Sequence, residues 1–171
     1  MLERVVTGGQ TGADQAGWRA AKSAGIATGG FVPMGCWTED GERPGFVDDY
    51  GAVPVEGGDL DESIRLRTWL NALESDATIW FGDHKSPGGK ATRHDCNRLR
   101  KPFLVIARPG PVDAEESARV IREAGYRVLN VAGNRESSVP GIGAWVEAHL
   151  VEVFRILKAE GDLPGSALAL A

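Results

Sequence analysis

The chain has 171 residues, with 24 acidic and 19 basic side chains, so its formal net charge is −5 with histidine neutral. The length predicts one domain, and a composition of 42% hydrophobic and 25% charged residues is typical of a globular protein rather than a disordered or fibrous one. The negative charge argues against non-specific binding to nucleic acid or to an anionic membrane surface. We therefore expect neither nucleic acid nor membrane as a partner.

Residues 1–5 lack the basic start and long apolar stretch of a signal peptide, and no apolar run approaches the roughly 18 residues that a membrane span needs. A cytoplasmic protein is the expectation. The two cysteines, Cys36 and Cys96, lie far apart and outside any CxxC motif. This spacing predicts two free thiols, without a disulfide framework or a structural metal site.

The first elements along the chain are predicted to be a strand, a glycine-rich loop and a helix. A short strand ending at Val6 runs into residues 7–14, Thr-Gly-Gly-Gln-Thr-Gly-Ala-Asp, and the helix that follows stops at Gly25, a residue type favoured at helix C-caps. Residues 26–32 predict a second strand. Residues 33–58, rich in Gly, Pro, Asp and Glu, predict a long irregular excursion, and such loops are usually functional or disordered.

The rest of the chain continues the alternation of helices and strands. Between residues 61 and 74, four apolar residues follow the i, i+3, i+4, i+7 spacing of one face of an amphipathic helix: Leu66, Trp69, Leu70 and Leu73. The pattern then predicts a strand at 77–81, a loop at 82–89, a helix at 91–100, a strand at 103–106, a helix from a capping box of Asp113 and Glu116 to Gly125, a strand at 127–131, and a last helix with an apolar stripe from Ile142 to Leu157.

Strands that alternate with helices predict an α/β protein, a Rossmann-like three-layer α/β/α fold with a mainly parallel sheet of about five or more strands. Right-handed crossovers place the helices on both faces of such a sheet. We expect residues 1–161 to form a single ligand-binding domain and residues 162–171 a C-terminal tail. Ligands of these folds bind beyond the carboxyl ends of the strands, where the glycine-rich loops of this chain lie.

Three loops at these strand ends predict an anion-binding site. Residues 8–12 place backbone N–H groups and a helix N-terminus where phosphate could bind, although they form neither a G-x-G-x-x-G nor a Walker A motif. Alternatively, these glycines only permit a tight turn, and Lys85, Lys90 and Arg93 near the second loop are solvated surface charges. The predicted ligand contacts are Gly8, Gly9, Gln10, Thr11, Gly12, Asp14, Gly29, Gly30, Lys85, Gly88, Gly89, Lys90, Thr92, Gly133, Arg135 and Glu136.

Signatures of covalent catalysis are missing from the sequence. There is no G-x-S-x-G elbow, and Cys96 has no evident activating partner. If the protein is an enzyme, Asp95 and Glu136 are the candidate acid and base. Of the three histidines, His84 is the one expected near a ligand, whereas His149 lies on an apolar helix stripe and is expected to be structural.

The motifs taken together resemble the molybdenum carrier protein family, in order, from about residue 4 to residue 157. The residues that carry the resemblance are 7–14, 28–30, Pro33, Gly35, 39–41, Arg67, Thr68, Asn71, 75–78, Gly88, Gly89, Thr92, 129–133, 135–137 and 140–142. The resemblance implies a Rossmann-like domain, assembly as a dimer or tetramer, and binding of molybdenum cofactor (molybdopterin), a pterin with a phosphate and an anionic molybdenum centre.

The same resemblance implies kinship with the lysine-decarboxylase-like phosphoribohydrolases, whose glycine loop is P-G-G-x-G-T-x-x-E. Residues 87–95 of this chain are Pro-Gly-Gly-Lys-Ala-Thr-Arg-His-Asp, so Ala91 replaces a glycine and Asp95 a glutamate. Met34 and Lys90 stand where the carrier family commonly has lysine and threonine. We hypothesise that one cation has moved between loops and that Lys90 contacts the anion.

Three functions therefore remain open from the sequence. The first is a carrier for a phosphate-bearing small molecule, with molybdenum cofactor as the favoured ligand. The alternatives are a nucleotide phosphoribohydrolase that cleaves the N-glycosidic bond of nucleoside monophosphates, and a sensor of a nucleotide-derived ligand. Trp37 and Trp80 either stack on a flat ligand ring or belong to the core.

Overall fold

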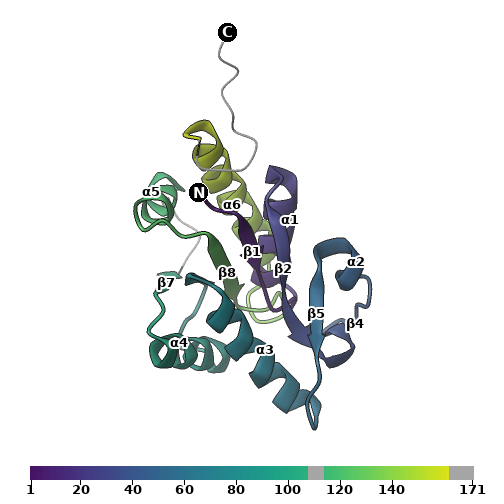
Figure 1. Cartoon of the computed structure of the whole chain (residues 1–171). Helices are drawn as coiled ribbons and strands as arrows, with labels where there is room; N and C mark the ends of the chain where they lie inside the picture. The colour runs from purple at the N-terminus through teal and green to yellow at the C-terminus, as the bar shows by residue number, and fades with distance from the viewer. Residues whose placement is uncertain (108–113, 162–171) are drawn as a thin grey trace.

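A computed structural model describes residues 1–107 and 114–161 of the chain (Figure 1). In this part of the chain a six-stranded parallel sheet has the strand order β5-β2-β1-β8-β6-β7. The predicted Rossmann-like α/β fold is confirmed. The strands are β1 (Arg4–Val6), β2 (Ala27–Pro33), β5 (Ala52–Val55), β6 (Ala77–Phe81), β7 (Phe103–Ile106) and β8 (Val128–Gly133).

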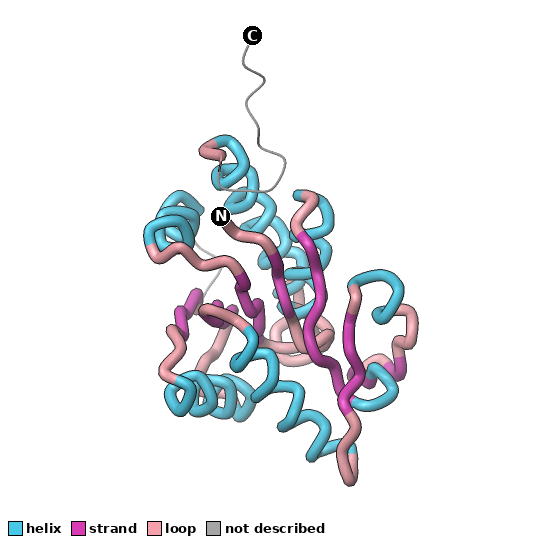
Figure 2. Tube along the Cα trace, in the orientation of Figure 1, coloured by secondary structure: helices cyan, strands magenta, loops and turns pink. Residues whose placement is uncertain are grey.

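Helices cover both faces of the sheet (Figure 2). On one face, α6 (Ile142–Ala159) packs against both α1 (Ala13–Ala24) and α5 (Ala114–Glu123). On the other face, α3 (Leu60–Glu74) and α4 (Pro87–Leu99) lie side by side (Figure 1). The two layers of helices leave the carboxyl ends of the strands at one edge of the molecule, which is where a Rossmann-like fold binds its ligand.

The two faces of the sheet differ in polarity. Under α6, Phe81 packs edge-on against Trp145, with ring centroids 5.7 Å apart, within a large apolar core. Under α4, the buried residues include polar ones: Thr78 Oγ1 accepts hydrogen bonds from Asn130 Nδ2 at 3.0 Å and from Cys96 Sγ at 3.4 Å. The layer beneath α3 and α4 is therefore the polar one.

Helix α3 forms as predicted, but its apolar stripe does not face the sheet. Its buried side is polar: Ser63 Oγ donates to a backbone carbonyl of β5, and the Asn71 amide bonds to both the N–H and the C=O of Phe31 at 2.8 Å. Leu66 and Leu73 are 38% and 43% exposed. An apolar stripe ordinarily faces the core. Here β1 is only three residues long, so the far half of β2 lacks a β1 partner and takes hydrogen bonds from α3 instead.

The prediction that residues 33–58 form a long irregular excursion is wrong. This segment contains a 3₁₀ turn η1 (Met34–Cys36), a two-stranded sheet of β3 (Trp37–Thr38) and β4 (Gly41–Glu42), the short helix α2 (Phe46–Tyr50), and β5 at the edge of the main sheet. A small second core holds it in place. Tyr50 stacks on Trp18 with ring centroids 4.7 Å apart, and Phe46 packs edge-on against the same indole.

Helix α4 begins at Pro87, earlier than the predicted residue 91. Ser86 is its N-cap and accepts a hydrogen bond from Gly89 N at 3.2 Å, while proline suits the first helical position because it has no N–H to satisfy. Gly88 and Lys90, which were expected in a loop, therefore lie in the first turn of a helix.

Other expectations about the elements are confirmed. The first helix ends at Gly25 in the left-handed conformation, and the last helix spans the predicted stripe. Cys36 and Cys96 are unpaired and buried. Asp113 of the predicted capping box, like residues 162–171, lies outside the described residues.

Within the described part of the chain, no helix combines the length and apolarity that a membrane crossing requires.

Candidate functional site

The glycine-rich loop after β1 is bonded largely within itself. Gly9 N donates to Thr7 Oγ1 at 3.1 Å, Thr11 N donates to Gln10 Oε1 at 3.0 Å, and Gln10 N donates to Asp14 Oδ2 at 3.3 Å. Asp14 lies in the first turn of α1 and is buried. Its carboxylate thus supplies, from within the chain, the negative charge that a helix N-terminus favours.

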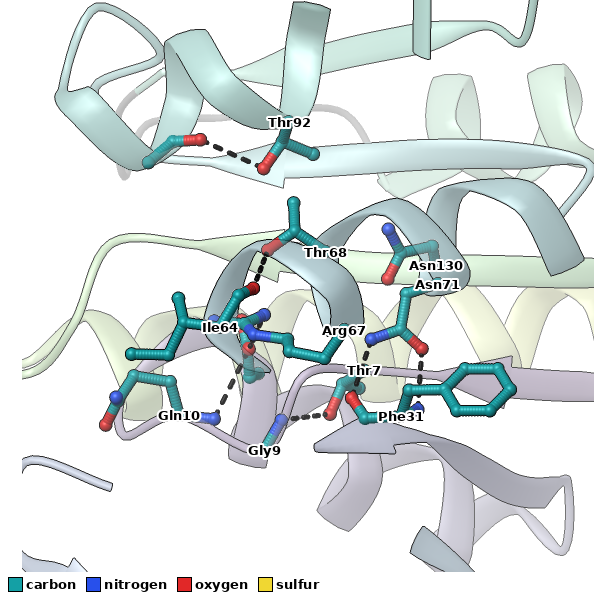
Figure 3. Close-up of polar contacts among 12 residues, drawn as sticks. Thr7, Gly9, Gln10, Phe31, Ile64, Arg67, Thr68, Asn71, Thr92 and Asn130 are labelled. Carbon is teal, nitrogen blue, oxygen red and sulfur yellow. Dashed lines mark hydrogen bonds and ion pairs between the residues drawn. The ribbon is translucent and has the colours of Figure 1, made fainter. Parts of the chain in front are cut away.

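Arg67 of α3 reaches into this loop. Its Nη1 lies 3.5 Å from Asp14 Oδ2, and both side chains are largely buried. Figure 3 shows Arg67 between Ile64 and the loop residues Thr7 and Gln10. Burial raises the pKa of Asp14 although the charge of Arg67 and backbone hydrogen bonds oppose the rise. A Cβ atom at Gly8 would lie 1.7 Å from Arg67 Nη1, so glycine is required there for Arg67 to enter.

Arg67 was not among the ligand contacts predicted from the loops. The signal that could have revealed it is the i, i+4, i+8 spacing of Ser63, Arg67 and Asn71, which places three polar residues on one face of α3, beside its apolar stripe. Once that polar face packs against the sheet, Arg67 is carried to the carboxyl end of β1.

A cleft with a volume of about 1070 Å³ lies between α3 and α4 and extends to the carboxyl ends of β6 and β8. Thr68 of α3 and Thr92 of α4 face it from the two helices (Figure 3). It brings together residues from all three predicted loops: Gln10, Asp14, Gly88, Lys90, Thr92, Asp95, Gly133 and Arg135. The predicted contacts that do not line it are Gly8, Gly9, Thr11, Gly12, Gly29, Gly30, Lys85, Gly89 and Glu136.

Several glycines outside the cleft allow close backbone packing. The sequence alone had left open the alternative that such glycines only permit a tight turn and do not contact a ligand. Gly30 has φ 120°, and a Cβ there would lie 2.3 Å from Thr7 O. Gly12 has φ 77°, and a Cβ there would lie 2.6 Å from Asn134 O. These two glycines bring β2 against β1, and the first loop against the loop after β8.

The walls of the cleft carry four cationic side chains, Arg65, Arg67, Lys90 and Arg135. The acidic residues on its walls are Asp14, which pairs with Arg67, together with Glu56, Glu62 and Asp95. Two N–H groups of cleft-lining residues, Arg67 Nε and Trp80 Nε1, are buried and have no hydrogen-bond partner in the described part of the chain. Buried donors of this kind are rare in folded proteins and call for an acceptor.

Glu39, in the turn between β3 and β4, holds the loop after β8 in place. Its carboxylate accepts hydrogen bonds from Thr11 Oγ1 and from Ser137 N, the latter at 3.1 Å, and its own N–H donates to Gln10 Oε1 at 2.9 Å. Arg135, in the same loop, lies with its guanidinium carbon 5.7 Å from the centroid of the Trp37 ring. The segment predicted to be irregular thus supports one wall of the cleft.

The two candidate acids have different environments. Asp95 lines the cleft, and burial raises its pKa although the charges of His94 and Arg98 oppose the rise. Glu136 accepts hydrogen bonds from Gly141 N and Gly143 N, at the start of α6. Its carboxylate therefore caps a helix and does not face the cleft.

The histidines differ partly from expectation. His94 lines the cleft, whereas His84 does not. His149 is buried, packs edge-on against Phe81 with ring centroids 5.8 Å apart, and contacts Ser117 Oγ at 3.2 Å, which confirms its structural role. Over residues 1–107 and 114–161, there is no group of three or more His, Cys, Asp or Glu side chains that could hold a metal ion.

The fold and the cleft define a Rossmann-like α/β protein with a polar pocket at the carboxyl ends of its strands. Residues 5–154 match the model of the circularly permuted YpsA SLOG family, and the chain belongs to this family. A comparison with curated protein sequences gave no significant match.

Among solved structures, the chain is similar to a crystal structure of the "Putative molybdenum carrier protein" from Syntrophus aciditrophicus SB. The two chains are 31% identical with a TM-score of 0.75, over 90% of this chain and 94% of the other. This similarity confirms the resemblance noted in the sequence.

Proposed function

We propose that the protein binds a phosphate-bearing small molecule in the cleft between α3 and α4 and carries it without chemical change, with molybdenum cofactor as the candidate ligand. The observation that carries the proposal is the convergence on one cleft of Lys90 and Arg135 with Arg67 and Trp80, two lining residues whose Nε and Nε1 donors are buried and have no partner among the described residues. Donors and cations on the walls of one cleft complement an anion rich in oxygen acceptors.

The first turn of α4 is the proposed phosphate contact. Gly89 N and Lys90 N are bonded to Ser86, whereas the N–H of Gly88 finds no acceptor among the described residues. Gly88 lines the cleft, so its N–H and the positive end of the helix dipole are available to an anion there. Lys90 and Arg135 add charge, and the planar guanidinium of Arg135 suits two phosphate oxygens at once.

The size of the cleft and the name of the relative support a ligand as large as molybdenum cofactor. The cleft volume of about 1070 Å³ is slightly larger than the range for pockets that bind drug-sized ligands, roughly 300–1,000 Å³. The indoles of Trp69 and Trp80 give it aromatic walls suited to a flat ring. The similar protein from Syntrophus aciditrophicus is named as a carrier of molybdenum. Binding followed by release also needs no nucleophile.

The test is to purify the chain under mild, anaerobic conditions and to identify the small molecules that stay bound by mass spectrometry. We expect molybdenum in metal analysis, together with a pterin released on denaturation. Lys90→Ala should retain about tenfold less ligand and show a weaker salt dependence, since one cation is lost. Lys158→Ala, on the exposed side of α6, is the matched control. Retention of a different molecule, or of none after incubation with the cofactor, would reject the proposal.

Asp95 favours one alternative function. It lines the same cleft with a raised pKa, and a carboxyl group of this kind can activate water for cleavage of an N-glycosidic bond. Incubation with nucleoside monophosphates discriminates between the two functions. Release of free base that is abolished in Asp95→Asn would establish a phosphoribohydrolase, whereas no release together with a retained pterin would support the carrier.

A further inference from the structure

The hairpin of β3 and β4 is bonded to two of the loops that contribute to the cleft. In its turn, the carboxylate of Glu39 accepts a hydrogen bond from Thr11 Oγ1, in the loop after β1. It also accepts hydrogen bonds from Ser137 N, at 3.1 Å, and from Ser137 Oγ, both in the loop after β8. One side chain thus ties together two loops whose strands are neighbours in the sheet.

The same turn fixes the side-chain amide of Gln10. Its Oε1 accepts hydrogen bonds from Glu39 N at 2.9 Å and from Thr11 N at 3.0 Å. Because two N–H donors can face only the oxygen of a glutamine amide, these partners determine the orientation of the amide. Gln10 is 5% exposed and lines the cleft, and its Nε2 donates to no residue that the structure describes. The NH2 group is therefore the end of this buried side chain that remains for a ligand.

The hairpin also contacts Arg135, a second donor on the wall of the cleft. The guanidinium carbon lies 5.7 Å from the centroid of the Trp37 ring in β3, a distance at which a cation is attracted to an aromatic ring. Burial alone would raise the pKa of Glu39, but the hydrogen bonds to its carboxylate and the charge of Arg135 outweigh burial and hold this pKa below the ordinary 4.5. Glu39 is therefore charged at neutral pH, as a side chain that only accepts hydrogen bonds must be.

We infer that Glu39 is a positioning residue for ligand binding, because it holds Gln10 Nε2 and the Arg135 guanidinium at the cleft through the β3–β4 hairpin. This inference rests on the proposed function and names the ligand group that the two residues select. Both offer N–H donors and no free acceptor, so the part of the ligand that they contact must supply oxygen acceptors, as a phosphoryl group or an oxo-metal centre does. An amino group there is disfavoured because its N–H groups would face other donors.

Equilibrium dialysis against molybdenum cofactor released from a purified molybdoenzyme, with bound molybdenum measured by metal analysis, tests the role of Glu39. Glu39→Ala should weaken binding about tenfold, because two donors lose their fixed positions. Glu39→Gln keeps one oxygen acceptor and should recover part of the affinity. Glu42→Ala is the matched control, since Glu42 is an exposed carboxylate of the same hairpin. Equal losses in the two alanine variants, or no loss in Glu39→Ala, would overturn the inference.

Nitrogen-15 relaxation of the Gln10 side-chain amide separates positioning from a general effect on stability. In the ligand-free wild type Nε2 should be as rigid as the backbone, because the amide oxygen is held by two hydrogen bonds. In Glu39→Ala it should become mobile, while thermal unfolding shows that the fold is retained. A Gln10 amide that stays rigid in this variant contradicts a positioning role.

Gln10→Glu tests the donor itself without disturbing the turn. The variant keeps an oxygen for Glu39 N and Thr11 N but replaces the NH2 group with a carboxylate oxygen, so cofactor affinity should fall by more than about tenfold. Competition shows which oxygens Gln10 contacts: a weaker effect of inorganic phosphate in the variant indicates the phosphoryl group, and a weaker effect of molybdate indicates the metal centre. Unchanged affinity for the cofactor would overturn the donor role. A wild type that does not bind the cofactor rejects the proposed function, whereas a wild type that binds it and is insensitive to these substitutions overturns this inference alone.

Discussion

Arg67 and Asp14 form an ion pair in the interior of the protein, with Nη1 and Oδ2 3.5 Å apart. The pair joins α3, on one face of the sheet, to the first turn of α1, on the other. Burial disfavours the charged form of each group, and it therefore raises the pKa of Asp14 and lowers the pKa of Arg67. Each charge compensates the other for the loss of water, and both residues line the cleft.

Removing one partner of this pair should be strongly destabilising. We expect Arg67→Met to lower the free energy of unfolding by about 3–5 kcal/mol, because Asp14 is left buried without a counter-ion. The double variant Arg67→Met/Asp14→Asn should be more stable than Arg67→Met alone. The raised pKa of Asp14 favours its protonated, neutral form in the folded state. The stability lost in Arg67→Met should therefore become smaller as the pH falls toward 4.

Urea unfolding at pH 7 and pH 4 measures both effects. Arg155→Met is the matched control, since Arg155 pairs with Glu152 on the exposed surface of α6 and its loss should have little effect. Equal losses in the two Arg→Met variants would contradict the interpretation.

Asp76 should contribute to stability at neutral pH. Its Oδ2 accepts hydrogen bonds from Arg127 N at 2.7 Å and Val128 N at 2.8 Å. Burial raises the pKa of Asp76, but these hydrogen bonds and the nearby charges of Lys101 and Arg127 outweigh that effect and hold it below the ordinary value of 3.8.

The charged form of Asp76 therefore stabilises the fold above pH 3.8, and this contribution disappears as the pH falls through the lowered value. Asp76→Asn should be less stable than the wild type at pH 7 by about 1 kcal/mol, a modest figure because the carboxylate is partly exposed. The difference should narrow on acidification in urea titrations between pH 7 and pH 2. Curves that stay parallel over this range would refute the assignment.

Two glycines with positive φ should respond differently to alanine. Gly30→Ala places a Cβ 2.3 Å from Thr7 O, at a φ of 120°, so the β1–β2 contact must open. We expect a loss of more than about 2 kcal/mol or a failure to fold. At Gly25, with φ 75°, no atom lies within 4 Å of the added Cβ, so Gly25→Ala should cost about 1–2 kcal/mol from backbone strain alone. Thermal unfolding of the two variants compares them directly, and equal losses would show that the contact with Thr7 is unimportant.

A substitution at Trp80 tests whether its indole N–H donates to the ligand or whether the side chain only packs in the core. Trp80→Phe removes a buried N–H that has no partner among the described residues, so the unliganded protein should change in stability by less than about 1.5 kcal/mol. If the N–H binds the ligand, affinity should fall about tenfold. Titration calorimetry gives the affinity, and Trp145→Phe, on the opposite face of the sheet against Phe81, should leave it unchanged. Unaltered affinity in Trp80→Phe would assign the indole to packing alone.

The elements of the fold were largely predictable because they depend on local patterns. Three local signals predicted the backbone: the glycine after the first helix, the long apolar stripe beginning at Ile142, and the alternation of apolar strands with helices. Each of them acts on residues that are near one another in the sequence. The meeting of the three loops at one edge of the sheet was also predictable, because the carboxyl ends of parallel strands lie together. Residues 33–58 were misjudged because their short elements are stabilised by aromatic contacts with Trp18, which is distant in the sequence.

The site itself was only partly predictable. Gln10, Lys90 and Arg135 were expected to lie together and they line one cleft. Arg67 was missed, because a charged residue in an amphipathic helix is ordinarily solvated. Asp14 was expected as a ligand contact, yet its carboxylate already accepts a hydrogen bond from the glycine loop and pairs with Arg67.

The sequence by itself determined which residues share a face of each element, since periodicity follows from the geometry of helix and strand. It did not determine which face turns inward. That was decided by the tertiary structure: the short β1 leaves the backbone of Phe31 without a strand partner on one side, Asn71 of α3 supplies the missing hydrogen bonds, and the helix must therefore turn its leucines outward. The need to satisfy buried backbone groups outweighed the burial of an apolar stripe.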